Sequence, residues 1–216
     1  MLFFVVSALA VVACFLLVGY SGDSLGFYQI SGGESFSEIK GKLKAQGFAM
    51  DGRDAEPFIF LDEDFNEYYT FASQTPLLNT LKKAFFDLRI EEPLYSSRES
   101  LYLNTYLMRR SMDDAEAGFC LSAFDGSLLY VYCFVDDILP LLDDYRARFE
   151  VRGPFTVEGE QGAYTLWYFE EGGEALIFDT GNNPANDASG GVTVFYAENI
   201  QAFYARMRAD LKRQGE

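Results

Sequence analysis

The chain of 216 residues contains no histidine. Histidine is the most common general base and metal ligand near neutral pH, so its absence excludes Ser-His and Cys-His catalysis. Three cysteines without histidine are also too few for an ordinary zinc site. A glycine-rich phosphate-binding loop is missing as well. The sequence therefore favours a non-enzymatic role, and we expect neither a metal nor another cofactor.

Basic residues are also scarce. The chain has 17 lysines and arginines against 33 aspartates and glutamates, which gives a net charge of −16. A nucleic-acid partner is excluded on this ground, because phosphate contacts require a basic surface. The same charge would attract a cationic partner or divalent ions. We expect the partner to be a protein or a component of the cell envelope, and a cationic partner would fit this charge. An acidic surface that only keeps the domain soluble is the alternative.

A long apolar run opens the chain. Residues 2–20 (LFFVVSALAVVACFLLVGY) contain no charged residue, and no Lys or Arg precedes Lys40. As a helix, this run would rise about 28 Å, close to the hydrocarbon thickness of a bilayer. We predict that residues 1–21 form a transmembrane anchor. Because the flank after the run is acidic, we expect residues 22–216 to form a domain outside the cytoplasm.

Two other interpretations of the apolar run stay open. Gly19-Tyr20-Ser21 supplies small residues at the positions that signal peptidases require, and cleavage there would release a secreted or periplasmic domain. Val11-Val12-Ala13-Cys14 is a weak match to a lipoprotein signal, because the apolar run continues beyond Cys14.

The remaining chain of about 195 residues is long enough for a substantial core, and its 21 Phe and 14 Tyr supply apolar area. Its patterns predict an α+β fold in which antiparallel sheet or sheets pack against amphipathic helices. The Ser35 and Glu38 pair fits a capping box, and Pro76 fits a first helical position. Helices are predicted at 36–46, from 75, within 89–116, from 138 and at 199–213, although Leu101, Leu103 and Thr105 alternate as in a strand. Hairpins are predicted at 57–71 and 117–134, and further strands at 25–30, 150–157, 163–170, 174–179 and 191–196.

The order of predicted elements repeats. Strand, helix, strand, aromatic hairpin and amphipathic helix follow one another in residues 25–89 and again in residues 127–213. This order suggests two similar βαββα-type halves, with boundaries near 25–115 and 117–216. Residue identity between the halves is low, so chance similarity is the alternative.

The predicted hairpin over residues 117–134 brings two cysteines near each other. A turn at Asp125-Gly126 leaves Cys120 and Cys133 diagonal on one face of the hairpin. A turn at Gly126-Ser127 makes them directly opposite, with Cα atoms about 4.5 Å apart, inside disulfide range. Cys120 and Cys133 are therefore a candidate disulfide, and two reduced core cysteines are the alternative.

Asp179-Thr180-Gly181 follows the apolar stretch Ala175-Leu176-Ile177-Phe178. This pattern resembles the active-site strand of pepsin-like and retropepsin-like aspartic proteases. The resemblance implies that Asp179 is a catalytic carboxylate that shares a proton with a second aspartate. Since the chain has one such motif, the second aspartate would come from a symmetric partner. An acid-acting hydrolase is therefore the alternative function.

The run from Asp62 to Glu67 is rich in hard oxygen ligands. Asp62, Asp64 and Asn66 could bind a cation such as calcium, although the run lacks the glycine and the final glutamate of an EF-hand loop. A solvated hairpin tip is the alternative. The sequence thus predicts a tethered or exported acidic α+β domain that binds a protein or an envelope component.

Overall fold

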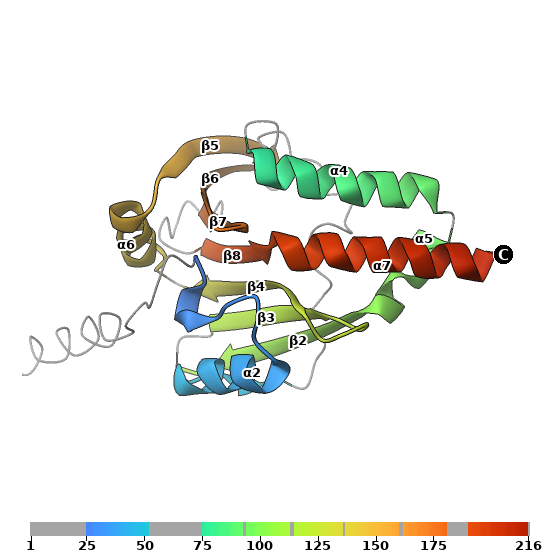
Figure 1. Ribbon diagram of the computed structural model, residues 1–216. Coiled ribbons are helices and arrows are strands. Elements are labelled where there is room, and N and C mark those ends of the chain that lie inside the picture. The colour runs from blue at the N-terminus through green and yellow to red at the C-terminus, as the bar shows by residue number, and fades with distance from the viewer. Residues whose placement is uncertain are drawn as a thin grey trace, which may run out of the picture.

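Eight strands form a single antiparallel sheet in the computed structural model of the chain (Figure 1). The structure describes residues 25–51, 75–92, 94–112, 115–135, 137–159, 162–180 and 190–215. The strands are β1 (Ala49–Met50), β2 (Leu103–Arg110), β3 (Ala115–Ser122), β4 (Leu128–Val135), β5 (Val151–Gly159), β6 (Gly162–Glu171), β7 (Glu174–Thr180) and β8 (Gly190–Tyr196). The helices are the 3₁₀ turn η1 (Phe27–Gln29), α2 (Phe36–Ala45), α4 (Pro76–Glu91), α5 (Tyr95–Arg98), the 3₁₀ turn η3 (Glu99–Tyr102), α6 (Leu139–Arg148) and α7 (Ala197–Gly215).

The strand order is β1-β2-β3-β4-β8-β7-β6-β5. The sheet is thus two four-stranded groups that meet where β4 pairs with β8. This arrangement confirms the predicted α+β class with antiparallel strands. Both predicted halves, 25–115 and 117–216, contribute strands to one sheet, and a duplication stays a prediction.

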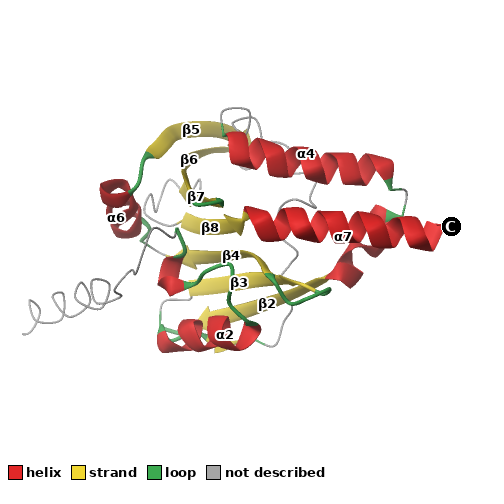
Figure 2. Ribbon diagram, in the orientation of Figure 1, coloured by secondary structure: helices red, strands yellow, loops and turns green. Residues whose placement is uncertain are grey.

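Helices cover both faces of the sheet (Figure 2). We call one side the α4/α7 face; its core includes Phe85, Tyr130 and Tyr204. The other is the α2/α6 face, whose core includes Leu43 and Tyr145. Strands that are covered on both sides need apolar residues on both sides, which explains the nearly unbroken apolar sequences of β4 and β8.

Local sequence signals explain where the helices begin. The Glu38 carboxylate accepts hydrogen bonds from the Ser35 backbone N–H at 2.8 Å and from the Ser35 hydroxyl at 2.7 Å. Pro76 occupies the first turn of α4, where its missing N–H costs nothing. The helices predicted at 36–46, from 75, from 138 and at 199–213 are confirmed.

Two predictions of secondary structure are wrong. Residues 103–110, expected to be helical, form β2, which pairs with β3 over its whole length. Successive side chains in this stretch point to opposite faces of the sheet, with Leu107 on the α4/α7 face and Met108 on the other. This alternation is the pattern of a strand. Residues 25–30, expected to be a strand, contain the short turn η1, in which Tyr28 and Gln29 have positive φ angles of 52° and 61°.

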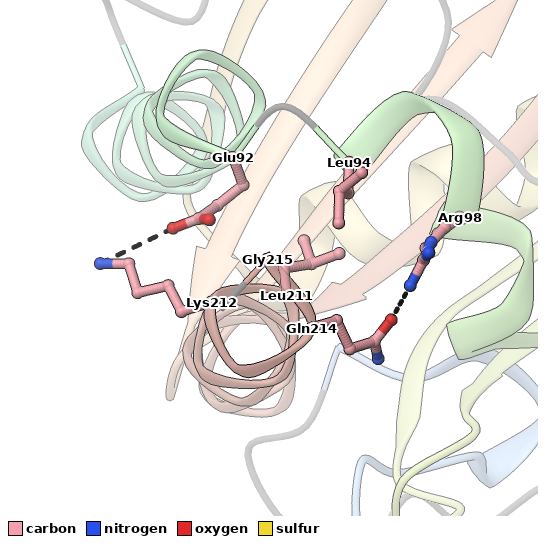
Figure 3. A pocket seen from close by; sticks show the side chains of 7 residues that line it. All are labelled: Glu92, Leu94, Arg98, Leu211, Lys212, Gln214 and Gly215. Atoms are coloured by element: carbon pink, nitrogen blue, oxygen red, sulfur yellow. Dashed lines mark hydrogen bonds and ion pairs between the residues drawn. The ribbon is translucent and has the colours of Figure 1, made fainter.

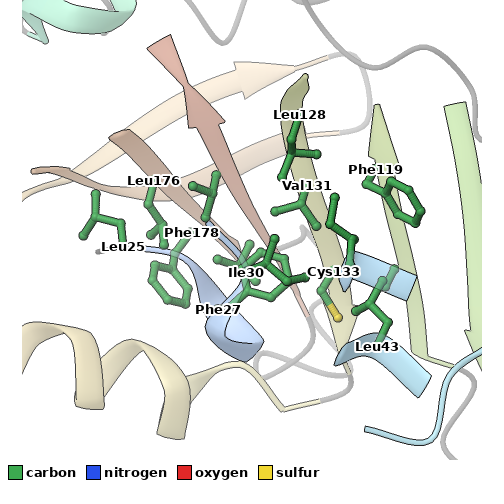
Figure 4. Packing of buried hydrophobic residues seen from close by; sticks show 14 of the residues in the cluster. Leu25, Phe27, Ile30, Leu43, Phe119, Leu128, Val131, Cys133, Leu176 and Phe178 are labelled. Atoms are coloured by element: carbon green, nitrogen blue, oxygen red, sulfur yellow. The ribbon is translucent and has the colours of Figure 1, made fainter. Parts of the chain in front are cut away.

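The segment that contains η1 lies against the α2/α6 face. Leu25, Phe27 and Ile30 all pack into the core on this side, beside Leu176 and Phe178 (Figure 4). A strand would alternate its side chains and expose half of them. The turn lets three apolar side chains of one short segment face the core together.

Hydrogen bonds fix the entry of the chain into the domain. The Leu25 backbone N–H donates to the Glu174 carboxylate at 2.7 Å, and the Tyr145 hydroxyl donates to the Leu25 carbonyl oxygen at 2.6 Å. Farther on, the Asn199 side chain donates to the Gly32 carbonyl oxygen at 2.8 Å. The first described residues are therefore held against the sheet and the beginning of α7.

Residues 1–21, the predicted anchor or signal segment, lie outside the described residues. Among the residues that the structure describes, no helix has both the length and the apolar character needed to cross a bilayer.

Gly118 offers a test of the packing on the α4/α7 face, because a Cβ atom there would lie 2.2 Å from the Tyr132 ring. We expect Gly118→Ala to lower the free energy of unfolding by about 1–3 kcal/mol, since the ring must leave its position. Gly41→Ala is the matched control: Gly41 lies in α2 with no atom near its added Cβ. It should raise stability by about 0.5–1 kcal/mol. Urea denaturation measures both, and equal effects would contradict this packing.

Candidate functional site

A crevice of about 660 Å³ lies where α4, α5 and α7 come together (Figure 3). Glu92 comes from the end of α4, Leu94 and Arg98 come from α5 and its approach, and the remaining residues come from the last turn of α7. The lining residues are Glu92, Leu94, Arg98, Leu211, Lys212, Gln214 and Gly215. Two leucines therefore give the crevice apolar walls, and three charged side chains line it as well.

Parallel packing of α4 and α7 brings their C-terminal ends to the crevice. Phe85 and Tyr204 are in ring contact, with centroids 6.3 Å apart. One to two turns farther along, Arg208 pairs with Glu91 at 3.3 Å. Each helix has a partial negative charge at its C-terminal end. Two such ends therefore lie side by side at the crevice.

Glu92 is the least exposed charged residue of the lining, with 6% of its surface accessible. Its atom Oε1 is buried and has no hydrogen-bond donor among the described residues. The Lys212 ammonium lies 3.6 Å from this oxygen, an ion-pair distance too long for a good hydrogen bond. A buried carboxylate oxygen without a donor is costly, so Glu92 can accept a stronger partner.

The opposite wall is held by a hydrogen-bond network. The Arg98 guanidinium donates to the Gln214 side-chain oxygen. The Gln214 amide donates to the Tyr102 hydroxyl at 3.2 Å, and that hydroxyl donates to the Asp210 carboxylate at 2.8 Å. Partial burial and the Asp210 carboxylate raise the pKa of Tyr102, so it keeps its proton at neutral pH. This network ties η3 and α5 to the end of α7.

Two exposed apolar side chains lie near the lining residues in the sequence, although neither lines the crevice. Ile90, in the last turn of α4, is 80% exposed, and Leu101 in η3 is 72% exposed. Exposed apolar side chains are typical of protein-binding surfaces when they form a patch. No pattern in the sequence indicates this site, because its walls come from segments more than 100 residues apart.

The structure places Asp179 within β7, where it pairs with Leu166 of β6 and with Gly191 of β8. Leu166 belongs to the core of the α4/α7 face, so Asp179 lies on that face, half-buried. Gly181, the last residue of the motif, lies outside the described residues. The catalytic role of Asp179 stays a prediction.

The two cysteines do not lie as the disulfide hypothesis requires. Cys120 pairs with Tyr130, and Cys133 pairs with Ala117. Cys120 packs into the core of the α4/α7 face, whereas Cys133 packs into that of the α2/α6 face. Both are reduced thiols in the structure.

A bulge is the physical reason for this difference. The loop closes with a hydrogen bond from the Ser122 N–H to the Ser127 carbonyl oxygen, and the register shifts between Cys120 and Leu121. Leu129 is the additional residue of β4. A one-residue change of register turns each side chain to the other face, so both expected registers for this hairpin are wrong.

The predicted cation-binding residues Asp62, Asp64 and Asn66 lie outside the described residues. Within the described ranges, no group of three acidic, cysteine or histidine side chains is placed to hold a metal ion. These ranges hold 20 of the 33 acidic and 16 of the 17 basic residues, a net charge of −4. Most of the excess negative charge thus belongs to residues outside them.

No family model, no curated protein and no solved structure matches this chain.

Cys120 should make the free energy of unfolding depend on pH, because burial raises the pKa of its thiol to about 12. An unfolded cysteine loses its proton near pH 8.5. Above that pH the folded state binds one more proton than the unfolded state, so stability falls as pH rises, by about 1.4 kcal/mol per unit for this group. Cys120→Ala should show a correspondingly shallower decline between pH 9 and 11 in urea titrations. Identical slopes for the two proteins would contradict a buried thiol.

Proposed function

We propose that this chain is a membrane-tethered or exported, non-enzymatic module that binds a protein partner in the crevice between the ends of α4 and α7. The observation that carries the proposal is the apolar crevice wall of Leu94 and Leu211 next to the charged side chains of Glu92, Arg98 and Lys212. Apolar contact area next to charged groups is what protein interfaces combine.

The position of the crevice supports binding away from the membrane. Only residues 21–24 separate the apolar run from Leu25, and four residues span at most about 14 Å. Because Leu25 is hydrogen-bonded to Glu174, this side of the domain would stay close to a bilayer that holds residues 2–20.

The C-terminal end of α7, which lines the crevice, lies at the other end of that helix from the chain entry (Figure 1). Asn199, near the beginning of α7, contacts Gly32, and the helix then runs to Gly215. A helix of 19 residues is about 28 Å long. A soluble or envelope protein is therefore a better candidate than a lipid, and we place the domain outside the cytoplasm, with a secreted or periplasmic domain as the alternative.

The sheet edges offer a poorer surface for a partner strand. β1 has only two residues, and Gly153-Pro154 interrupts the pairing of β5 with β6. Proline has no N–H to donate, and proline and irregularities are features that protect sheet edges from adding strands. This favours the crevice over strand addition as the binding mode.

Site-specific photo-crosslinking in intact cells tests this proposal. A benzophenone amino acid at Ile90 or Leu101 of the full-length protein should give one discrete adduct, identified as the same protein from both positions by mass spectrometry. Met112 is the matched control, because it is apolar and 88% exposed but follows the far end of β2. Equal adducts from Met112, or none from Ile90 and Leu101, would rule out the crevice as the docking site.

A further inference from the structure

Glu92 indicates which kind of chemical group of a partner the crevice binds. Its carboxylate is removed from water, and Oε1 has no hydrogen-bond donor among the described residues. A carboxylate in this state gains most from a cationic donor, since charge-assisted hydrogen bonds are shorter and stronger than neutral ones. The C-terminal ends of α4 and α7 add partial negative charge at the same place, which also favours a cation.

Neither cation of the crevice fills this role well. Arg98 is engaged with Gln214 on the opposite wall. Lys212 lies 3.6 Å from Glu92 Oε1, and its side chain is 59% exposed. A largely exposed lysine at this distance contributes little to stability and can turn outward into solvent. In the unbound protein, Lys212 therefore forms an ion pair with the carboxylate but does not donate a hydrogen bond to it (Figure 3).

We propose, on the basis of the proposed function, that the partner segment carries an arginine that displaces Lys212 and binds Glu92, next to an apolar side chain that contacts Leu94 and Leu211. A guanidinium can donate two parallel hydrogen bonds to a carboxylate, whereas an ammonium acts as a point charge without this fork. Lys212 thus acts as an internal competitor for the partner.

The proposal makes opposite predictions for the two members of the ion pair. Glu92→Gln removes the charge that the arginine recognises while keeping the shape of the side chain, so affinity should fall. Lys212→Met keeps the apolar stem and removes the competitor, so affinity should rise. If the pair were only structural, both substitutions would act in the same direction, through the stability of the two helix ends.

Fluorescence anisotropy with the full-length protein in detergent micelles tests this. The probes are fluorescein-labelled peptides in which Leu-X-Leu is flanked by glycine and serine, with X as arginine, glutamine or glutamate. The arginine peptide should bind about ten-fold or more tightly than the glutamine peptide, the gain expected for a hydrogen bond to a charged group. Glu92→Gln should remove this difference, and Lys212→Met should strengthen binding of the arginine peptide several-fold.

The other outcomes separate this inference from the proposed function. Equal binding of all three peptides would overturn the arginine site while leaving the crevice as a docking surface. Tighter binding of the glutamate peptide would assign the crevice to an anion held by Arg98 and Lys212, and would overturn the inference. If no peptide binds, the inference fails, and the crosslinks from Ile90 and Leu101 decide the docking role independently. Unfolding midpoints of both variants show that they are folded.

Discussion

The pairing of β4 with β8 is the constraint on which the rest of the structure depends. Six residues of each strand face one another, from Tyr130 opposite Phe195 to Val135 opposite Gly190. This ladder joins the two four-stranded groups into one sheet and lies at its centre. Aromatic rings fill the surface beside it, because Phe134 lies over Gly191 and Tyr132 lies over Gly118. A side chain at Gly118 would push the Tyr132 ring out of the core, and a side chain at Gly191 would displace the partly exposed Phe134 ring.

The position of the crevice follows from this ladder. Helix α7 begins directly after the last residue of β8, so the direction of the strand limits where the helix can go. Asn199 then donates to the carbonyl oxygens of Gly32 and Leu128, both at 2.8 Å, and fixes the first turn. Packing of α4 along α7 brings Glu92 to Lys212. The site is therefore built at the far end of a rigid helix instead of on a loop.

Much of the fold could be predicted from local signals. The Ser35 and Glu38 pair and Pro76 mark helix starts, and the apolar run of β8 marks a strand. The register of the β3–β4 hairpin could not be predicted in this way. It depends on the bulge at Leu129, which reflects packing on both faces of the sheet and not the residues of the turn. The strand predicted at residues 25–30 was wrong for a related reason. Leu25 and Ile30 are apolar residues of the kind found in strands, but they pack on the face of a sheet that other residues form.

The candidate site was harder to predict than the fold. Its walls combine residues 92–98 with residues 211–215, and no pattern within either stretch shows that they meet. The acidic composition, which suggested an acidic binding surface, is spread unevenly along the chain, and the described ranges have a net charge of only −4. The informative feature is one buried carboxylate, Glu92, whose burial depends on packing between distant helices.

Native-state hydrogen exchange tests the central claim that the β4–β8 ladder unites the two strand groups. The backbone amides of these two strands should exchange only through global unfolding, with the highest protection in the domain and with equal free energies in β4 and β8. Lower protection in β4 and β8 than in β3 or β6, so that the two groups open as separate units, would contradict the account.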